Sequence, residues 1–91
     1  MRRLDAYRRG RGWTYDQLGD RLGRTGVQCG RYCRGESHPS LEIGQKLARL
    51  SDGAVHLGNY HDDLPEAEAK AMIARLRAAD AQTAQTAGGM S

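Results

Sequence analysis

The stretch Gly23–Gly35 constrains this chain more than any other part of its sequence. Thr25 is suited to capping the start of a helix and Gly35 to ending it. At about 100° per residue, one side of that helix collects Cys29, Tyr32 and Cys33. The opposite side, about 180° away, collects Val27, Arg31 and Arg34. The pattern predicts a short helix that buries one face and presents arginines to an anionic ligand with the other.

The residues just before this stretch predict another short helix. Thr14 and Gln17 form the Thr-x-x-Gln pattern of a capping box, Leu18 and Leu22 supply an apolar side, and Gly23 ends the helix. The same Thr-x-x-Gln pattern recurs from Thr25, so the connection between the two helices is very short. Two short helices joined through glycine by a turn of about 3–4 residues indicate a helix-turn-helix.

Two glycines lie inside the second of these helices. Gly26 and Gly30 each cost about 1 kcal/mol of helix stability relative to alanine. Either the backbone approaches something closely at these positions, or neighbouring elements hold the helix in place.

Helices are also predicted on both sides of this pair. A first helix over Arg3–Arg9 ends at Gly10 and Gly12, buries Leu4 and Tyr7, and turns outward Arg2, Arg3, Arg8 and Arg9. A fourth helix begins after its cap, Ser40, and buries Ile43, Leu47 and Leu50. A turn at Ser51–Gly53 leads to an irregular segment, Ala54–His61, with three core residues: Val55, Leu57 and Tyr60. The sequence thus predicts an all-α domain over residues 1–63.

The character of the chain changes at Leu64. Pro65, Glu66 and Glu68 favour a helix start, and an alanine-rich run continues to about Ala84. Its apolar stripe consists of Ala69, Met72, Ile73, Leu76 and Ala79. We assign residues 64–87 to a C-terminal helix that either packs on its own domain or serves dimerisation or partner binding, and residues 88–91 to a disordered tail.

Charge is distributed unevenly over the 91 residues. Residues 1–34 hold nine Arg and three Asp, a net charge of +6, whereas residues 35–91 have a net charge of −3. An arginine-rich half is typical of nucleic-acid binding, although a solvated basic surface is the simpler alternative. No apolar run approaches the roughly 18–20 residues that span a bilayer, and no signal peptide is recognisable. We expect a cytoplasmic, nucleoid-associated protein without membrane contact.

Nothing in the sequence predicts a metal, a cofactor or catalysis. Cys29 and Cys33 lie four residues apart on one helix face, which favours buried thiols over a disulfide or a metal site. The histidines show no zinc-ligand spacing. The acidic pair after His61, Asp62-Asp63, lacks a second cluster that would complete an active site. We therefore expect a protein that is not an enzyme and has no cofactor.

The residues from Leu4 to Asp63 resemble helix-turn-helix regulators of the lambdoid phage repressor and Cro type, the XRE-like family. The resemblance rests on residues at consistent spacing: Leu4, Tyr7, Arg8, Gly12-Trp13-Thr14, Leu18, Leu22-Gly23, Arg31-Tyr32, Arg34-Gly35, Pro39-Ser40, Leu47-Ala48, Gly53-Ala54-Val55 and Tyr60. It implies a lambda-repressor-like domain of about five helices, followed by the C-terminal helix. It also implies that the third helix, Thr25–Arg34, enters the major groove while the second lies across the DNA backbone.

The resemblance also implies individual contacts. Base edges would be met by Thr25, Gly26, Val27, Gln28 and Arg31. Val27 would touch a thymine methyl, and Arg31 would bind guanine O6 and N7, worth about 1–3 kcal/mol of discrimination. For Gln28, capping competes with an adenine contact, and we favour capping. Phosphates would be met by Arg8, Thr14, Tyr15, Arg24 and Arg34.

Three positions depart from the family pattern. Arg24 stands where the turn is commonly apolar, and Gly19 stands where alanine is usual, which permits closer helix packing. Cys33 replaces an acidic residue that often pairs with the arginine of the first helix, so Arg8 is expected to be freer for phosphate.

We therefore expect a sequence-specific, double-stranded DNA-binding transcriptional regulator that acts as a homodimer, with repression favoured over activation. The C-terminal helix could also contact RNA polymerase. The alternative is a protein-interaction module, such as an antitoxin or an adaptor, that uses this helix to bind its partner.

Overall fold

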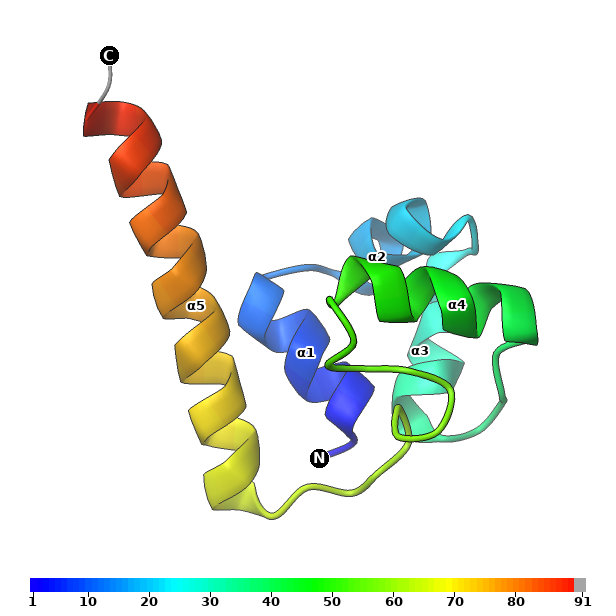
Figure 1. Cartoon of the computed structure of the whole chain (residues 1–91). Coiled ribbons are helices and arrows are strands. Elements are labelled where there is room, and N and C mark those ends of the chain that lie inside the picture. Colours follow the sequence, from blue (N-terminus) through cyan, green and yellow to red (C-terminus); the bar gives the residue numbers. More distant parts are fainter. Residues whose placement is uncertain (90–91) are drawn as a thin grey trace.

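The structure is a computed structural model that describes residues 1–89, with side chains described through Asp80. Its five helices confirm the all-α prediction (Figure 1): α1 (Arg3–Arg11), α2 (Tyr15–Leu22), α3 (Gly26–Arg34), α4 (Leu41–Leu50) and α5 (Glu66–Gly89). Within the described range, no helix has the length and apolarity that a membrane crossing requires. The tail expected from residue 88 begins inside α5, and residues 90–91 lie outside the described residues.

The helix caps follow from local sequence. Thr14 and Gln17 form the predicted reciprocal capping box of α2, and the hydroxyls of Thr25 and Ser40 accept backbone N–H groups at the starts of α3 and α4. Left-handed glycines end the first three helices: Gly12, Gly23 and Gly35. The predicted end of α1 was wrong, because the helix continues through Gly10 to Arg11.

Gly10 continues the helix because α5 packs closely against it. A Cβ atom built on Gly10 would lie only 2.8 Å from Leu76 Cβ, so the missing side chain admits the second helix. Ala69 and Met72 of α5 are buried, and Arg11 Nη1 lies 3.6 Å from an Asp80 carboxylate oxygen. The first turns of α5 therefore pack on their own domain, beside α1 (Figure 1).

The chain before α5 also closes the start of α1. Arg2 offers no side-chain cap, and instead the backbone N–H groups of Arg3 and Leu4 donate to the carbonyls of Asp62 (2.8 Å) and Tyr60 (3.0 Å). These bonds satisfy donors that a helix N-terminus leaves free. As a result, the connector from α4 to α5 is fixed along the first turn of α1.

A buried serine organises the turn after α4. Ser51 Oγ lies 2.9 Å from the Leu47 carbonyl oxygen and accepts the Val55 N–H at 2.9 Å. Val55 and Tyr60 are buried as predicted. Leu57 was wrongly assigned to the core: its side chain covers Gly44 from outside and remains 36% exposed.

The inner face of α3 completes the core. Cys29, Tyr32 and Cys33 are all buried, as the helical periodicity predicts, and both cysteines are free thiols. Burial raises the pKa of Cys29 to about 11 and that of Cys33 to about 12.

These thiols should report on opening of the domain. At pH 8, we expect a thiol reagent to modify the folded protein only as fast as it opens, and to modify both cysteines at once in denaturant. The contribution of the two thiols to stability should be constant below pH 9, the ordinary thiol pKa, and should fall as pH rises toward 11–12, because the unfolded chain then loses thiol protons first. Rapid modification under native conditions, measured by absorbance, would contradict the burial of these residues.

Candidate nucleic-acid interface

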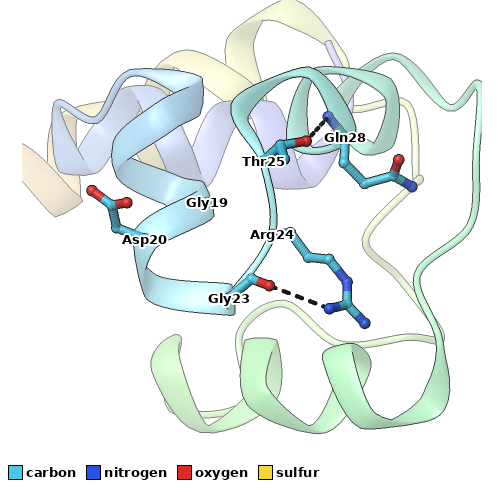
Figure 2. Close-up of a pocket in the computed structure, with 6 residues that line it drawn as sticks. All are labelled: Gly19, Asp20, Gly23, Arg24, Thr25 and Gln28. Atoms are coloured by element: carbon cyan, nitrogen blue, oxygen red, sulfur yellow. Dashed lines mark hydrogen bonds between the residues drawn. The ribbon is translucent and has the colours of Figure 1, made fainter.

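The turn between α2 and α3 depends on a glycine in α2. A Cβ atom on Gly19 would overlap the carbonyl oxygen of Arg24, and the Arg24 N–H donates to the Gly19 carbonyl at 3.0 Å. Gly23 supplies the left-handed residue between them, with φ of 71°. Figure 2 shows Gly19 beside the extended segment that connects α2 to α3. The expectation that Gly19 permits close packing is therefore confirmed.

The outer face of α3 carries the side chains that the helical periodicity places there. Val27 is 69% exposed, and Arg31 and Arg34 are exposed beside it. Since the opposite face is core, α3 is anchored on one side and open on the other.

A groove of about 450 Å³ separates the start of α2 from this outer face. Its lining consists of Thr14, Tyr15, Asp16, Gly26, Val27, Gly30 and Arg34. A Cβ atom on Gly26 would overlap the Asp16 carboxylate, and one on Gly30 would lie 3.5 Å from the Tyr15 ring. Gly26 therefore serves close approach to α2, which was one of the two explanations left open, whereas a side chain on Gly30 would make only an ordinary contact with Tyr15.

Tyr15 joins three helices in this groove. The Arg8 guanidinium lies 4.4 Å from the centre of the Tyr15 ring, within the range of a cation–π contact. On the other side, Arg34 Nη1 would lie 3.1 Å from a Cβ on Gly30, next to the same ring. Tyr15 is thus held in place at the first turn of α2.

Arg8 points inward, so its prediction as an outward residue was wrong. It donates two bonds to Asp5 Oδ1 (3.0 and 2.8 Å) and one to the Trp13 carbonyl (2.7 Å), and its side chain is only 14% exposed. Asp5, one turn earlier in α1, supplies a carboxylate partner, so the expectation that Cys33 leaves Arg8 freer was wrong. The phosphate role expected for Arg8 stays a prediction.

Gln28 does not complete a capping box. Its backbone N–H donates to Thr25 Oγ at 3.2 Å, but its side-chain amide donates to Ser37 Oγ at 3.3 Å instead of turning back to Thr25. The favoured capping interpretation was therefore wrong for the side chain. The loop after α3 supplies a partner that the local pattern could not reveal.

A second depression of about 680 Å³ lies on the other side of the turn. Figure 2 shows Arg24 and Gln28 extending the same way, while Asp20 points away from them. Arg24 is exposed and donates to the Gly23 carbonyl at 3.2 Å, so its guanidinium follows the turn. Its predicted phosphate contact stays a prediction.

Arg34 has an acidic partner that the sequence analysis did not single out. Its Nε and Nη2 atoms both lie 3.0 Å from Glu36 Oε2, and this hydrogen bonding lowers the pKa of the Glu36 carboxyl. The opposite charges two residues apart were the only available signal. Across the described residues, no group of three or more His, Cys, Asp or Glu could hold a metal.

Comparison with known proteins identifies the domain family. A family model described as a helix-turn-helix domain matches residues 2–55, which span α1 to α4 and end at Val55. Searches of curated proteins and of solved structures found no match to this chain.

The Gly19 contact yields a stability prediction. Gly19→Ala should destabilise the domain by about 1–3 kcal/mol despite its better helix propensity, because a backbone carbonyl cannot rotate away from the new methyl group. Urea unfolding measures the effect, and Asp20→Ala at the next, exposed position should stay within about 0.5 kcal/mol of the wild type. Equal stability of Gly19→Ala and the wild type would show that the Arg24 carbonyl does not restrict this position.

Proposed function

Because this chain belongs to the helix-turn-helix domain family, we propose that it is a sequence-specific, double-stranded DNA-binding transcriptional regulator. The observation that carries the proposal is the outer face of α3. There Val27, Arg31 and Arg34 are exposed side by side, on a helix whose other face is fixed in the core. We further propose a cytoplasmic homodimer that acts by binding and without catalysis, with repression favoured over activation.

Base reading is assigned to the first two turns of α3. Val27 offers its methyl groups to a thymine methyl, and Arg31 offers a guanidinium fork to guanine. The Gln28 amide donates one of its hydrogens to Ser37 Oγ, so its oxygen and second hydrogen are available for an adenine edge. Thr25 and Gly26 lie at the helix start, where the backbone itself can approach the bases.

Phosphate binding is assigned to the start of α2 and to surrounding arginines. The first N–H groups of a helix have no partner within it and favour anions. Thr14 and Tyr15 stand at this position, and Tyr15 is held there by Arg8. Arg24 and Arg34 are exposed on either side of α3 and complete the set.

Arg31→Ala should reduce discrimination between DNA sites. We expect the ratio of affinities for a selected site and a scrambled duplex to fall about 5- to 150-fold, the equivalent of about 1–3 kcal/mol. Site selection from random duplexes followed by fluorescence anisotropy measures this ratio, with Arg77→Ala on α5 as the control for charge. An unchanged ratio would remove Arg31 from base reading.

Salt dependence tests DNA binding itself. If each protomer neutralises about four phosphates, log affinity should fall against log salt with a slope of roughly −7 for a dimer. A nearly flat dependence would contradict the proposed function.

A second candidate function is protein interaction through α5, as in an antitoxin, an adaptor or a contact with RNA polymerase. The specific observation is that α5 runs to Gly89, and Figure 1 shows its red end directed away from α1–α4. The packed residues Ala69 and Met72 lie in its first turns, so the two ends of the helix are suited to different tasks.

Deletion of residues 81–91 tests whether the end of α5 serves dimerisation, without removing the packed turns. We expect the shortened chain to stay folded by circular dichroism, to have the mass of a monomer in solution and to bind DNA less tightly. Deletion from residue 64 would instead remove Leu64, Ala69 and Met72 from the core, and should unfold the domain. An unchanged mass with unchanged DNA affinity would exclude both dimerisation and DNA support by the deleted turns.

A further inference from the structure

The pair formed by Arg34 and Glu36 lies at the edge of the proposed interface. Arg34 belongs to the outer face of α3 and lines the groove that α3 forms with Tyr15 and Val27. Glu36 follows the end of α3 and reaches back to it. Both side chains are half exposed, at 50% and 55%, so solvent and ligands can reach the pair.

Glu36 uses the edge of the guanidinium that a phosphate would use. Nε and Nη2 of Arg34 converge on one carboxylate oxygen of Glu36 at 3.0 Å each. Adjacent N–H groups of this kind bind carboxylates and phosphates in the same geometry. Arg34 Nη1 is directed elsewhere, over Gly30 and toward the Tyr15 ring.

We propose that Glu36 is an internal competitor for DNA: in the free protein, its carboxylate occupies the position on Arg34 that a backbone phosphate takes in the complex. This inference rests on the proposed function. A phosphate can use this edge of Arg34 only when Glu36 leaves it, and the released carboxylate then lies near a second anion. Glu36 therefore limits the affinity for DNA and is a determinant of binding strength that makes no favourable contact with DNA.

The surroundings favour competition over a structural role. Exposed ion pairs contribute little to folding, and the backbone already ends α3 through the left-handed Gly35, independently of Glu36. Loss of the pair should therefore leave the domain folded.

A double-mutant cycle tests the proposal on the full-length protein. The variants are Glu36→Gln, Arg34→Gln and the double variant, and the probe is a mixed-sequence DNA duplex titrated at low ionic strength by fluorescence anisotropy. Glu66→Gln is the matched control, because it makes the same charge change and breaks an ion pair with Lys70 (2.9 Å) on α5. Thermal unfolding of each variant confirms that it is folded.

We expect Glu36→Gln to bind roughly two- to fivefold more tightly than the wild type, the range of an exposed ion pair. In the Arg34→Gln background, the same change should leave affinity almost unaltered, and Glu66→Gln should not alter it.

Three results would overturn the inference. Unchanged or weaker binding by Glu36→Gln would show that Glu36 does not compete. An equal gain with and without Arg34 would show general electrostatic repulsion instead. If the wild type binds no duplex at all, the proposed function fails together with the inference, whereas the first two results leave DNA binding intact.

Discussion

The contact between Gly19 and the Arg24 carbonyl sets the distance between α2 and α3, and the rest of the surface depends on that distance. With α2 this close, Asp16 reaches the start of α3 and Tyr15 reaches its middle, where Gly26 and Gly30 leave space for them. The close approach of the two helices therefore depends on two glycines, Gly19 and Gly26. Each costs helix propensity, and each is used for approach of another chain segment.

The arginine content of the first 34 residues overstates the positive charge available to a ligand. Arg8 donates hydrogen bonds within the domain, to Asp5 and to the Trp13 carbonyl. Arg11 and Arg21 lie over the Trp13 ring, at 4.9 and 4.6 Å from its centre. The arginines that remain exposed at the candidate interface are those of α3 and of the turn before it. Net charge alone could not distinguish arginines that are paired within the domain from arginines that are exposed to a ligand, because both add the same charge.

Features that depend on neighbouring residues were predictable from the sequence, whereas features that depend on distant ones were not. The caps at Thr14, Thr25 and Ser40 and the two faces of α3 follow from spacing within one or two turns. The continuation of α1 through Gly10 required α5 to arrive from more than sixty positions along the chain, at Leu76. In the candidate site, the exposure of Val27 and Arg31 was predictable. The partners of Gln28 and Arg34 come from the loop after α3, whose path no local pattern defines.

Helix α1 contacts two other parts of the molecule, α5 and the first turn of α2. Near its C-terminal end, Gly10 and Arg11 contact α5. In its middle, Arg8 contacts the ring of Tyr15. The same helix therefore contacts both α5 and the first turn of α2. A shift of α1 would alter its contacts with α5 and with α2 together.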